Sequence, residues 1–185
     1  MQSIQLQSDA TQEQLDFIFE MLREIRHVPG DIVEIGSWKC GTSGIIAATL
    51  PNRTVWAFDL FGGMPYGMQG PPFNYFADTN WEDIQRNALN FPNLQLVRGA
   101  HEETVPEFAK RAGEIALLYM DSDHYSSHKV SLECLSPLVS REGLILFHDW
   151  RFAEVQQAVN EVIVPSEWKI MDGRDMHGMG ALRKN

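Results

Sequence analysis

Residues 31–50 read DIVEIGSWKCGTSGIIAATL and contain the first strand, turn and helix of a pattern that recurs along the chain. The apolar run over 31–35 predicts a buried strand that ends at Gly36. A polar turn with a second glycine follows, and the small apolar residues of 43–50 predict a helix. Units of this kind are typical of α/β proteins, in which ligands bind at the carboxyl edge of the sheet.

The same alternation continues to the end of the chain. Further strands are expected over 54–58, 94–97, 115–120 and 143–147, with two short ones around 167–171 and 177–183. Further helices are expected over 11–27, 79–87, 102–111, 126–139 and up to 162, and Thr79 and Glu82 have the spacing of a capping box. Strands that are apolar throughout predict a Rossmann-like, doubly wound α/β fold with a mostly parallel sheet.

Length and composition predict one domain. A chain of 185 residues with 44% hydrophobic residues suits a single core, and no repeat or linker divides it. Residues 1–185 are therefore expected to form one domain, with a helix within 1–28 before the first strand. The segment 60–78 is rich in aromatic residues, methionine and proline. It is expected to be a lid over a substrate, although ordinary packing or a homodimer contact explains it equally well.

Charge and cysteine content narrow the possible partners and compartments. A net charge of −10 argues against nucleic acid, because phosphate binding needs a basic face. Cys40 and Cys134 lack disulfide or zinc spacing, and no signal peptide or membrane span is visible. We therefore expect a cytoplasmic protein that acts on a small, neutral or cationic molecule and binds no membrane.

The turn after the first strand predicts a cofactor site. A dinucleotide fingerprint from Gly36 would need glycine at position 38, where this chain has Trp38. S-adenosylmethionine has no phosphate, and its amino-acid end can use a helix N-terminus. Asp59, at the end of the second strand, is placed to accept hydrogen bonds from the ribose hydroxyls. The alternative is that the glycines make a tight turn and Asp59 only caps it.

The third strand ends in residues 98–102, Arg-Gly-Ala-His-Glu. Ala100 would leave room for an adenine, and His101 or Glu102 would lie near the edge of its ring. A plain turn before a helix explains these residues equally well.

Two polar clusters follow the next two strands. Asp121, Asp123 and His124 come after 115–120, and His148 and Asp149 come after 143–147. Neighbouring strands lie about 5 Å apart, so Asp121, His148 and Asp149 are expected to converge on one Mg²⁺ or Mn²⁺ ion. Asp123 or His124 would accept the proton from a hydroxyl acceptor. The alternative is that these are solvated polar residues at strand ends, or that Asp121 caps the next helix.

Several stretches resemble the macrocin O-methyltransferase family. The quoted motifs are VEIGSWKCGTS, FDLFGGMP, GAHEETVPEF and the run from LLYMDSDHYSS to LILFHDW, within about residues 31–163. The resemblance implies a seven-stranded class I methyltransferase fold with the last strand antiparallel, S-adenosylmethionine as cofactor and Mg²⁺ at Asp121, His148 and Asp149. It also implies Asp123 as the base. One departure is clear: the family usually shows Asp-Asp-Tyr where this chain has His148-Asp149-Trp150.

These observations combine into one expected function and a set of site residues. The residues expected around the cofactor are Glu34, Gly36, Ser37, Gly41, Ser43, Asp59, Leu60, Ala100, His101 and Asp121. The expected reaction is metal-assisted transfer of the sulfonium methyl group to a hydroxyl of a sugar or natural-product-like molecule. The alternatives are an N-methyltransferase or a metal-independent methyltransferase on the same fold, an NAD(P)-dependent oxidoreductase, and a non-catalytic cofactor-binding protein.

Overall fold

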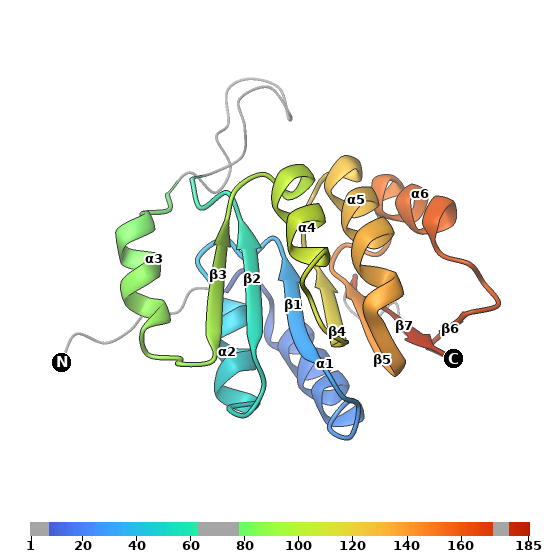
Figure 1. Cartoon of the computed structure of the whole chain (residues 1–185), viewed down its shortest axis with the longest axis horizontal. Helices are drawn as coiled ribbons and strands as arrows, with labels where there is room; N and C mark the ends of the chain where they lie inside the picture. Colours follow the sequence, from blue (N-terminus) through green and yellow to red (C-terminus); the bar gives the residue numbers. More distant parts are fainter. Residues whose placement is uncertain (1–7, 63–77, 172–177) are drawn as a thin grey trace.

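The computed structural model describes residues 8–62, 78–171 and 178–185. Within these ranges helices and strands alternate in the predicted order (Figure 1). The helices are α1 (Gln12–Glu24), α2 (Gly41–Thr49), α3 (Trp81–Ala88), α4 (His101–Ala109), α5 (Tyr125–Leu135), the short 3₁₀ turn η1 (Ser136–Leu138) and α6 (Ala153–Val162). The strands are β1 (Asp31–Ile35), β2 (Val55–Asp59), β3 (Leu94–Arg98), β4 (Ile115–Met120), β5 (Val139–Phe147), β6 (Trp168–Ile170) and β7 (Gly180–Lys184).

The strands form one seven-stranded sheet in the order β3-β2-β1-β4-β5-β7-β6. The first five strands pair in parallel, and β7 lies antiparallel to both of its neighbours. This confirms the predicted mostly parallel, Rossmann-like α/β fold. The chain runs outward from β1 to β3 and then returns to β4 on the other side of β1. Ligands of such folds bind where the strand order reverses, at the carboxyl ends of β1 and β4.

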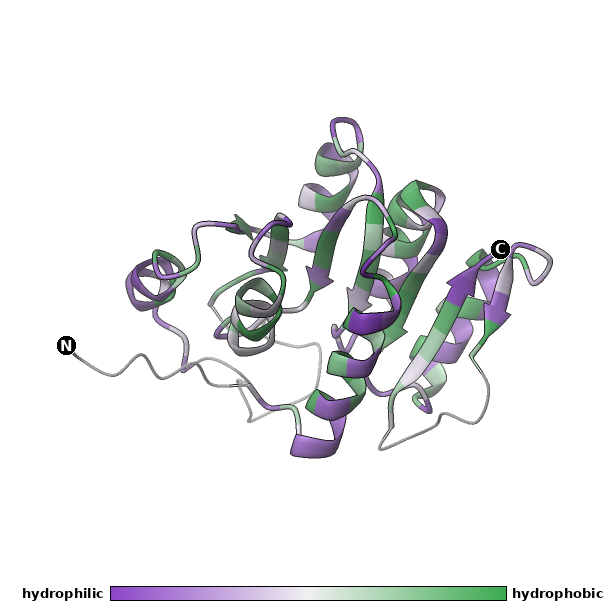
Figure 2. Cartoon of the chain, turned by 90° about the horizontal axis from the view of Figure 1, so that it is seen from below, coloured by the Kyte–Doolittle hydropathy of each residue, from purple (hydrophilic) through white to green (hydrophobic). Residues whose placement is uncertain are grey.

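Helices cover both faces of the sheet and bury two separate cores. One core packs α1, α2 and α3 against one face, and the other packs α4, α5 and α6 against the opposite face. The strands between them are strongly apolar, whereas the outer faces of the helices are mostly hydrophilic (Figure 2). Every residue of β4 is buried, as expected of a central strand covered on both faces.

Local chemistry explains where the helices begin. Thr11 is the N-cap of α1 and forms a capping box with Gln14. The expected capping box at Thr79 and Glu82 is wrong: the N-cap of α3 is Asn80, whose side chain accepts a hydrogen bond from the backbone N–H of Asp83 at 3.0 Å. The side-chain amide oxygen of asparagine caps a helix as well as a hydroxyl does, so the helix begins one residue later.

The boundary between α5 and β5 also differs from the prediction. The helix expected over 126–139 ends at Leu135, because Pro137 lacks the N–H that would continue it. The strand expected from 143 begins at Val139, and its pairing with β4 slips between Ile115 and Leu117. The Ser140 hydroxyl donates to the carbonyl of Pro29 at 2.9 Å, which holds this irregular start against the loop before β1.

Two of the expected segments lie partly outside the residues that the structure describes. Most of the proposed lid at 60–78 lies outside them, and so does the beginning of the strand expected at 177–183. Within the described residues, no helix combines the length and the apolar character that a membrane span requires.

Candidate functional site

The loops after β1 and β4 touch at the point where the strand order reverses. The backbone N–H of Asp121 donates to the carbonyl of Ile35 at 2.8 Å. A Cβ atom at Gly36 would lie only 2.3 Å from the carbonyl oxygen of Asp121, and Gly36 has a φ of +89°. Glycine is therefore required here by both backbone conformation and close packing. This contact places the turn over residues 36–41, the glycine turn, directly beside the polar residues that follow β4 and β5. These residues, the acidic cluster, are Asp121, Asp123, His124, His148 and Asp149.

Asp59 holds the glycine turn through its backbone. One carboxylate oxygen accepts from the N–H groups of Ser37 at 3.0 Å and Trp38 at 2.9 Å. The other accepts from the N–H of Phe61 at 2.7 Å. The structure thus shows the capping role that was one of the two interpretations of Asp59. A carboxylate has about four acceptor sites, so this role and a ribose contact are compatible.

Glu34 lies beneath the turn and is 1% exposed. The hydroxyls of Ser37 and Ser43 both donate to one of its carboxylate oxygens, with a distance of 2.9 Å for Ser37. Burial, together with the nearby charge of Asp121, raises the pKa of Glu34 well above its usual value. Glu34 therefore supports the turn from below, and its two serine partners fix the start of α2.

The N-terminus of α2 offers backbone donors at the same edge. Its N-cap, Cys40, has a left-handed backbone conformation and makes no side-chain capping hydrogen bond. The first N–H groups of a helix have no partner within the helix, so those of Gly41, Thr42 and Ser43 suit a carboxylate. The hydroxyl of Thr42 contacts that of Ser8 at 2.8 Å, so the segment before α1 reaches this helix end.

Side-chain hydrogen bonds link the start of α4, just after β3, to α5. Ala100 is the N-cap of α4, and His101 follows it. The Nδ1 of His101 lies 2.5 Å from the Ser127 hydroxyl, which in turn donates to the Ser122 hydroxyl at 2.9 Å. Burial lowers the pKa of His101, which favours a neutral ring. The sequence offered no short-range signal for the contact between His101 and Ser127, because these two residues lie 26 positions apart.

Asp121, His148 and Asp149 converge as predicted. Residues Met120 and Phe147 are register partners at the ends of β4 and β5, so the residues that follow them lie side by side. His148 Nδ1 is 3.1 Å from Oδ1 of Asp121 and 3.1 Å from Oδ2 of Asp149. The hydrogen bond to Asp149 and the charge of Asp121 outweigh burial and raise the pKa of His148 to about 9.

The carboxylates at this edge differ in their surroundings. Burial raises the pKa of Asp121 to about 6, with the charge of His148 opposing the shift. Burial and the charge of Asp149 also raise the pKa of Asp123. His124 is the N-cap of α5, and its Nε2 atom is buried and has no hydrogen-bond partner within the described residues.

Strained backbone concentrates at this edge. Among the described residues, five that are not glycine have a positive φ. Four of them follow β1, β2 or β5 at the carboxyl edge: Trp38, Cys40, Phe61 and Asp149. Such conformations cost free energy and cluster at functional sites. At Trp38, Cys40 and Phe61 they were not predictable, because these residue types rarely adopt a left-handed backbone, whereas aspartate, the type at Asp149, does so more readily.

The side chains of Asp121, His148 and Asp149 are not the all-oxygen set of ligands that Mg²⁺ prefers. Magnesium prefers an octahedron of oxygen ligands, and His148 supplies a nitrogen. In the described part of the chain, no group of three His, Cys, Asp or Glu side chains is arranged to hold a metal ion. The three side chains thus converge as expected; the imidazole nitrogen argues against Mg²⁺ as the ion, and binding of Mn²⁺ stays a prediction.

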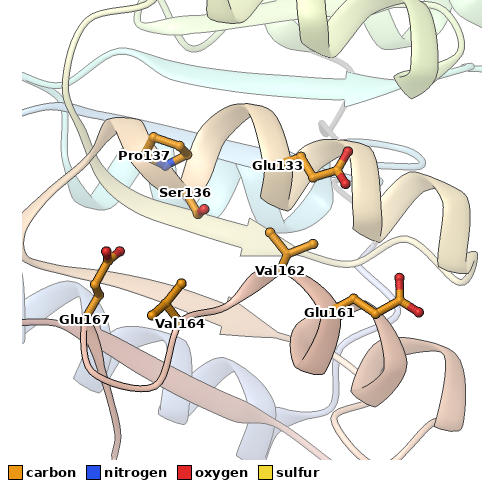
Figure 3. Close-up of a pocket in the computed structure, with 7 residues that line it drawn as sticks. All are labelled: Glu133, Ser136, Pro137, Glu161, Val162, Val164 and Glu167. Carbon is orange, nitrogen blue, oxygen red and sulfur yellow. The ribbon is translucent and has the colours of Figure 1, made fainter.

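A cavity of about 540 Å³ lies at the opposite edge of the sheet (Figure 3). Helices α5 and α6 begin beside the acidic cluster, and their last residues line this cavity. At 1.5 Å per residue, α5 separates the two places by about 16 Å. The cavity is therefore no part of the candidate site. Its lining consists of Glu133, Ser136, Pro137, Glu161, Val162, Val164 and Glu167.

A family model described as Macrocin-O-methyltransferase (TylF) matches residues 10–166. This chain belongs to the macrocin O-methyltransferase family. Among curated relatives, demethyldecarbamoylnovobiocin O-methyltransferase of Streptomyces niveus is 32% identical over 143 residues, which are 67% of this chain and 54% of that protein. The 4'-O-methyltransferase of Streptomyces olivaceus that acts on 8-demethyl-8-(2,3-dimethoxy-alpha-L-rhamnosyl)-tetracenomycin C is 28% identical, over 72% of this chain and 58% of its own.

Solved structures show the same fold as this member of the macrocin O-methyltransferase family. The O-methyltransferase NovP superposes with a TM-score of 0.79 at 24% identity, over 94% of this chain and 80% of NovP. The calicheamicin methyltransferase CalS11 has a TM-score of 0.75 at 23% identity, with the same coverage. The chain spans only about three fifths of the length of the curated relatives it matches.

Proposed function

We propose that this chain is an S-adenosylmethionine-dependent O-methyltransferase that acts on a hydroxyl of a small sugar or natural-product-like molecule. The observation that carries the proposal is the contact between the glycine turn and Asp121, which joins a cofactor-type turn to a cluster of possible bases. Family membership supports the reaction class, since the curated relatives are named as O-methyltransferases.

In this proposal the cofactor lies along the carboxyl edge from α2 to α4. Its carboxylate faces the N–H groups at the start of α2, and its ammonium faces the turn at Gly36 and the Asp121 carboxylate. The ribose lies against Asp59. The adenine lies near Leu60, Ala100 and His101, where the small side chain of Ala100 leaves space. Glu34, Ser37, Gly41 and Ser43 shape the turn that holds the amino-acid end.

The transfer itself needs a hydroxyl oxygen in line with the sulfonium methyl group. A new oxygen–carbon bond forms as the carbon–sulfur bond breaks, and S-adenosylhomocysteine and a methyl ether are the products. The hydroxyl proton goes to the carboxylate of Asp123, whose raised pKa brings it closer to that of a useful base. His124 is the second candidate for this role.

The acidic character of the chain supports a small acceptor rather than nucleic acid. The described residues share one sheet between two helical layers, which supports a single domain. A cytoplasmic location and a homodimer remain part of the proposal, on sequence grounds alone.

The experiment that tests the cofactor is calorimetric titration with S-adenosylhomocysteine, with NAD⁺ titrated in parallel. Micromolar binding of S-adenosylhomocysteine alone is the expected result, and turnover of hydroxylated acceptors is then measured. Binding of NAD⁺ instead would favour an oxidoreductase. Cofactor binding without turnover of any hydroxyl or amine acceptor would favour a non-catalytic binding protein. Turnover of amine acceptors alone would favour an N-methyltransferase.

A further inference from the structure

We propose that Ser127 and Ser122 are positioning residues for the cofactor, because they link the subsite for its adenine to the subsite for its amino-acid end. The inference rests on the proposed function, which places the adenine near His101 and the ammonium beside Asp121. Three side chains on separate elements form the link: His101 at the start of α4, Ser127 in the first turn of α5, and Ser122 in the loop between β4 and α5.

The Ser127 hydroxyl is the centre of this chain of hydrogen bonds. It lies 2.5 Å from Nδ1 of His101 and 2.9 Å from the hydroxyl of Ser122. A hydroxyl both donates and accepts, so the chain is continuous whichever ring nitrogen of His101 carries the proton. Ser122 and Ser127 are only 9% and 4% exposed. Water therefore competes little for these hydrogen bonds, and they hold their geometry better than exposed ones do.

One end of the chain is fixed at the carboxyl ends of β2 and β3. His101 directly follows Ala100, the N-cap of α4. Its second ring nitrogen, Nε2, lies 3.4 Å from the carbonyl oxygen of Phe58, which also accepts from the N–H of Gly36 at 2.9 Å. Both ring nitrogens of His101 thus face protein atoms. His101 therefore ties the segment beside the adenine to the glycine turn.

The other end of the chain is the loop between β4 and α5. Backbone hydrogen bonds hold this loop at its two ends: the N–H of Asp121 donates to the carbonyl of Ile35, and the carbonyl of His124 accepts from the N–H four residues on at 3.0 Å. Ser122 lies between these ends, so its hydroxyl gives the loop a third support. Asp121 immediately precedes Ser122, and Asp123, the proposed base, immediately follows it.

A fixed distance between these two ends matters for a ligand that spans them. The cofactor has its adenine at one end and its amino-acid group at the other. A ligand that contacts two subsites at once gains most affinity when both are already held at the spacing that it spans. The chain from His101 to Ser122 holds the adenine segment and the loop after β4 at one spacing. A compound that occupies only one of the two subsites gains nothing from it.

A second hydrogen bond joins the same two helices at the surface. The Ser126 hydroxyl donates to Oε1 of Glu102 at 2.7 Å, where α4 and α5 lie side by side (Figure 1). This hydrogen bond joins α4 to α5, whereas the Ser127 hydroxyl also contacts Ser122 in the loop. Ser126→Ala is therefore a matched control for Ser127→Ala, because the two variants share the substitution, the helix and the neighbouring helix.

The test measures the affinity of two ligands for the natural chain, Ser127→Ala and Ser126→Ala. S-adenosylhomocysteine, which spans both subsites, is titrated by calorimetry. Methylthioadenosine, which has the nucleoside and the sulfur but no amino-acid end, is measured by competition with it. Ser127→Ala should weaken S-adenosylhomocysteine binding about tenfold and methylthioadenosine binding by less than about twofold, and Ser126→Ala should change neither.

An equal loss for both ligands in Ser127→Ala, or no loss for either, would overturn the inference, and so would the same split in Ser126→Ala. Ser122→Ala breaks the chain at its other end and is read by the same criteria if Ser127→Ala does not fold. The double variant should lose no more affinity than either single variant, because one chain is broken only once, and additive losses would contradict the inference. A natural chain that does not bind S-adenosylhomocysteine counts instead against the proposed function.

Discussion

Replacing Gly36 by alanine tests whether the two loops of the proposed site depend on their close approach. The new Cβ would lie 2.3 Å from the carbonyl oxygen of Asp121 and 2.7 Å from its carbonyl carbon. Alanine at a φ of +89° costs about 1–2 kcal/mol because of its left-handed backbone. Overpacking against backbone that cannot rotate away adds about 1–3 kcal/mol. Gly36→Ala should therefore lower the free energy of unfolding by about 2–5 kcal/mol.

Two other glycines separate these contributions. Gly178 has a similar φ of +84°, but a Cβ there would meet no described residue within 4 Å, so Gly178→Ala should show the backbone cost alone. Gly113 has no positive φ, and a Cβ there would have no neighbour within 4 Å in the described part of the chain, so Gly113→Ala should be neutral or slightly stabilising. The assay is urea unfolding of all four proteins, followed by circular dichroism. Equal destabilisation by Gly36→Ala and Gly178→Ala would refute the reasoning, because the close contact would then cost nothing.

Three further substitutions address the cofactor, the base and a buried histidine. Asp59→Ala should weaken S-adenosylhomocysteine binding by roughly 10- to 100-fold, since a hydrogen bond to a charged group contributes about 1.5–3 kcal/mol. The control, Asp83→Ala on the exposed face of α3, should leave the affinity unchanged. If calorimetry shows unchanged affinity in Asp59→Ala as well, Asp59 does not bind the ribose. Asp123→Asn should lower kcat by roughly 100-fold or more and leave cofactor affinity nearly unchanged, so full turnover by this variant would assign the base elsewhere. Burial lowers the pKa of His128 to about 4. The folded state therefore binds fewer protons than the unfolded state between about pH 6.5 and 4. The free energy of unfolding should fall as the pH drops through this window, by up to about 1.4 kcal/mol per pH unit. Because burial also lowers the pKa of His101, His128→Leu should reduce that slope in urea unfolding measured from pH 7 to 4 rather than abolish it, and an unchanged slope would show that His128 does not contribute to it.

The order of elements was predictable because each depends on local chemistry. Apolar runs such as Ile115–Met120 form strands that are buried on both faces, and amphipathic stretches such as Gln12–Glu24 form helices against them. Since parallel strands all end at one edge, the sequence also predicted that Asp121, His148 and Asp149 would meet. Boundaries were less certain: Asn80 rather than Thr79 begins α3, because several side chains in a row were able to cap it.

The sequence by itself thus determined the fold class, the edge of the sheet that carries the polar residues, and the residue types available there. Only the tertiary structure decided how these residues pair. Asp59 binds three backbone N–H groups, Glu34 is buried beneath two serines, and the Nδ1 of His148 lies between two carboxylates. Such pairings form or fail with differences of a few tenths of an ångström in the distance between two polar atoms, often on segments far apart in the chain. Local sequence patterns carry no information on those distances, because packing of the whole sheet and its helices sets them.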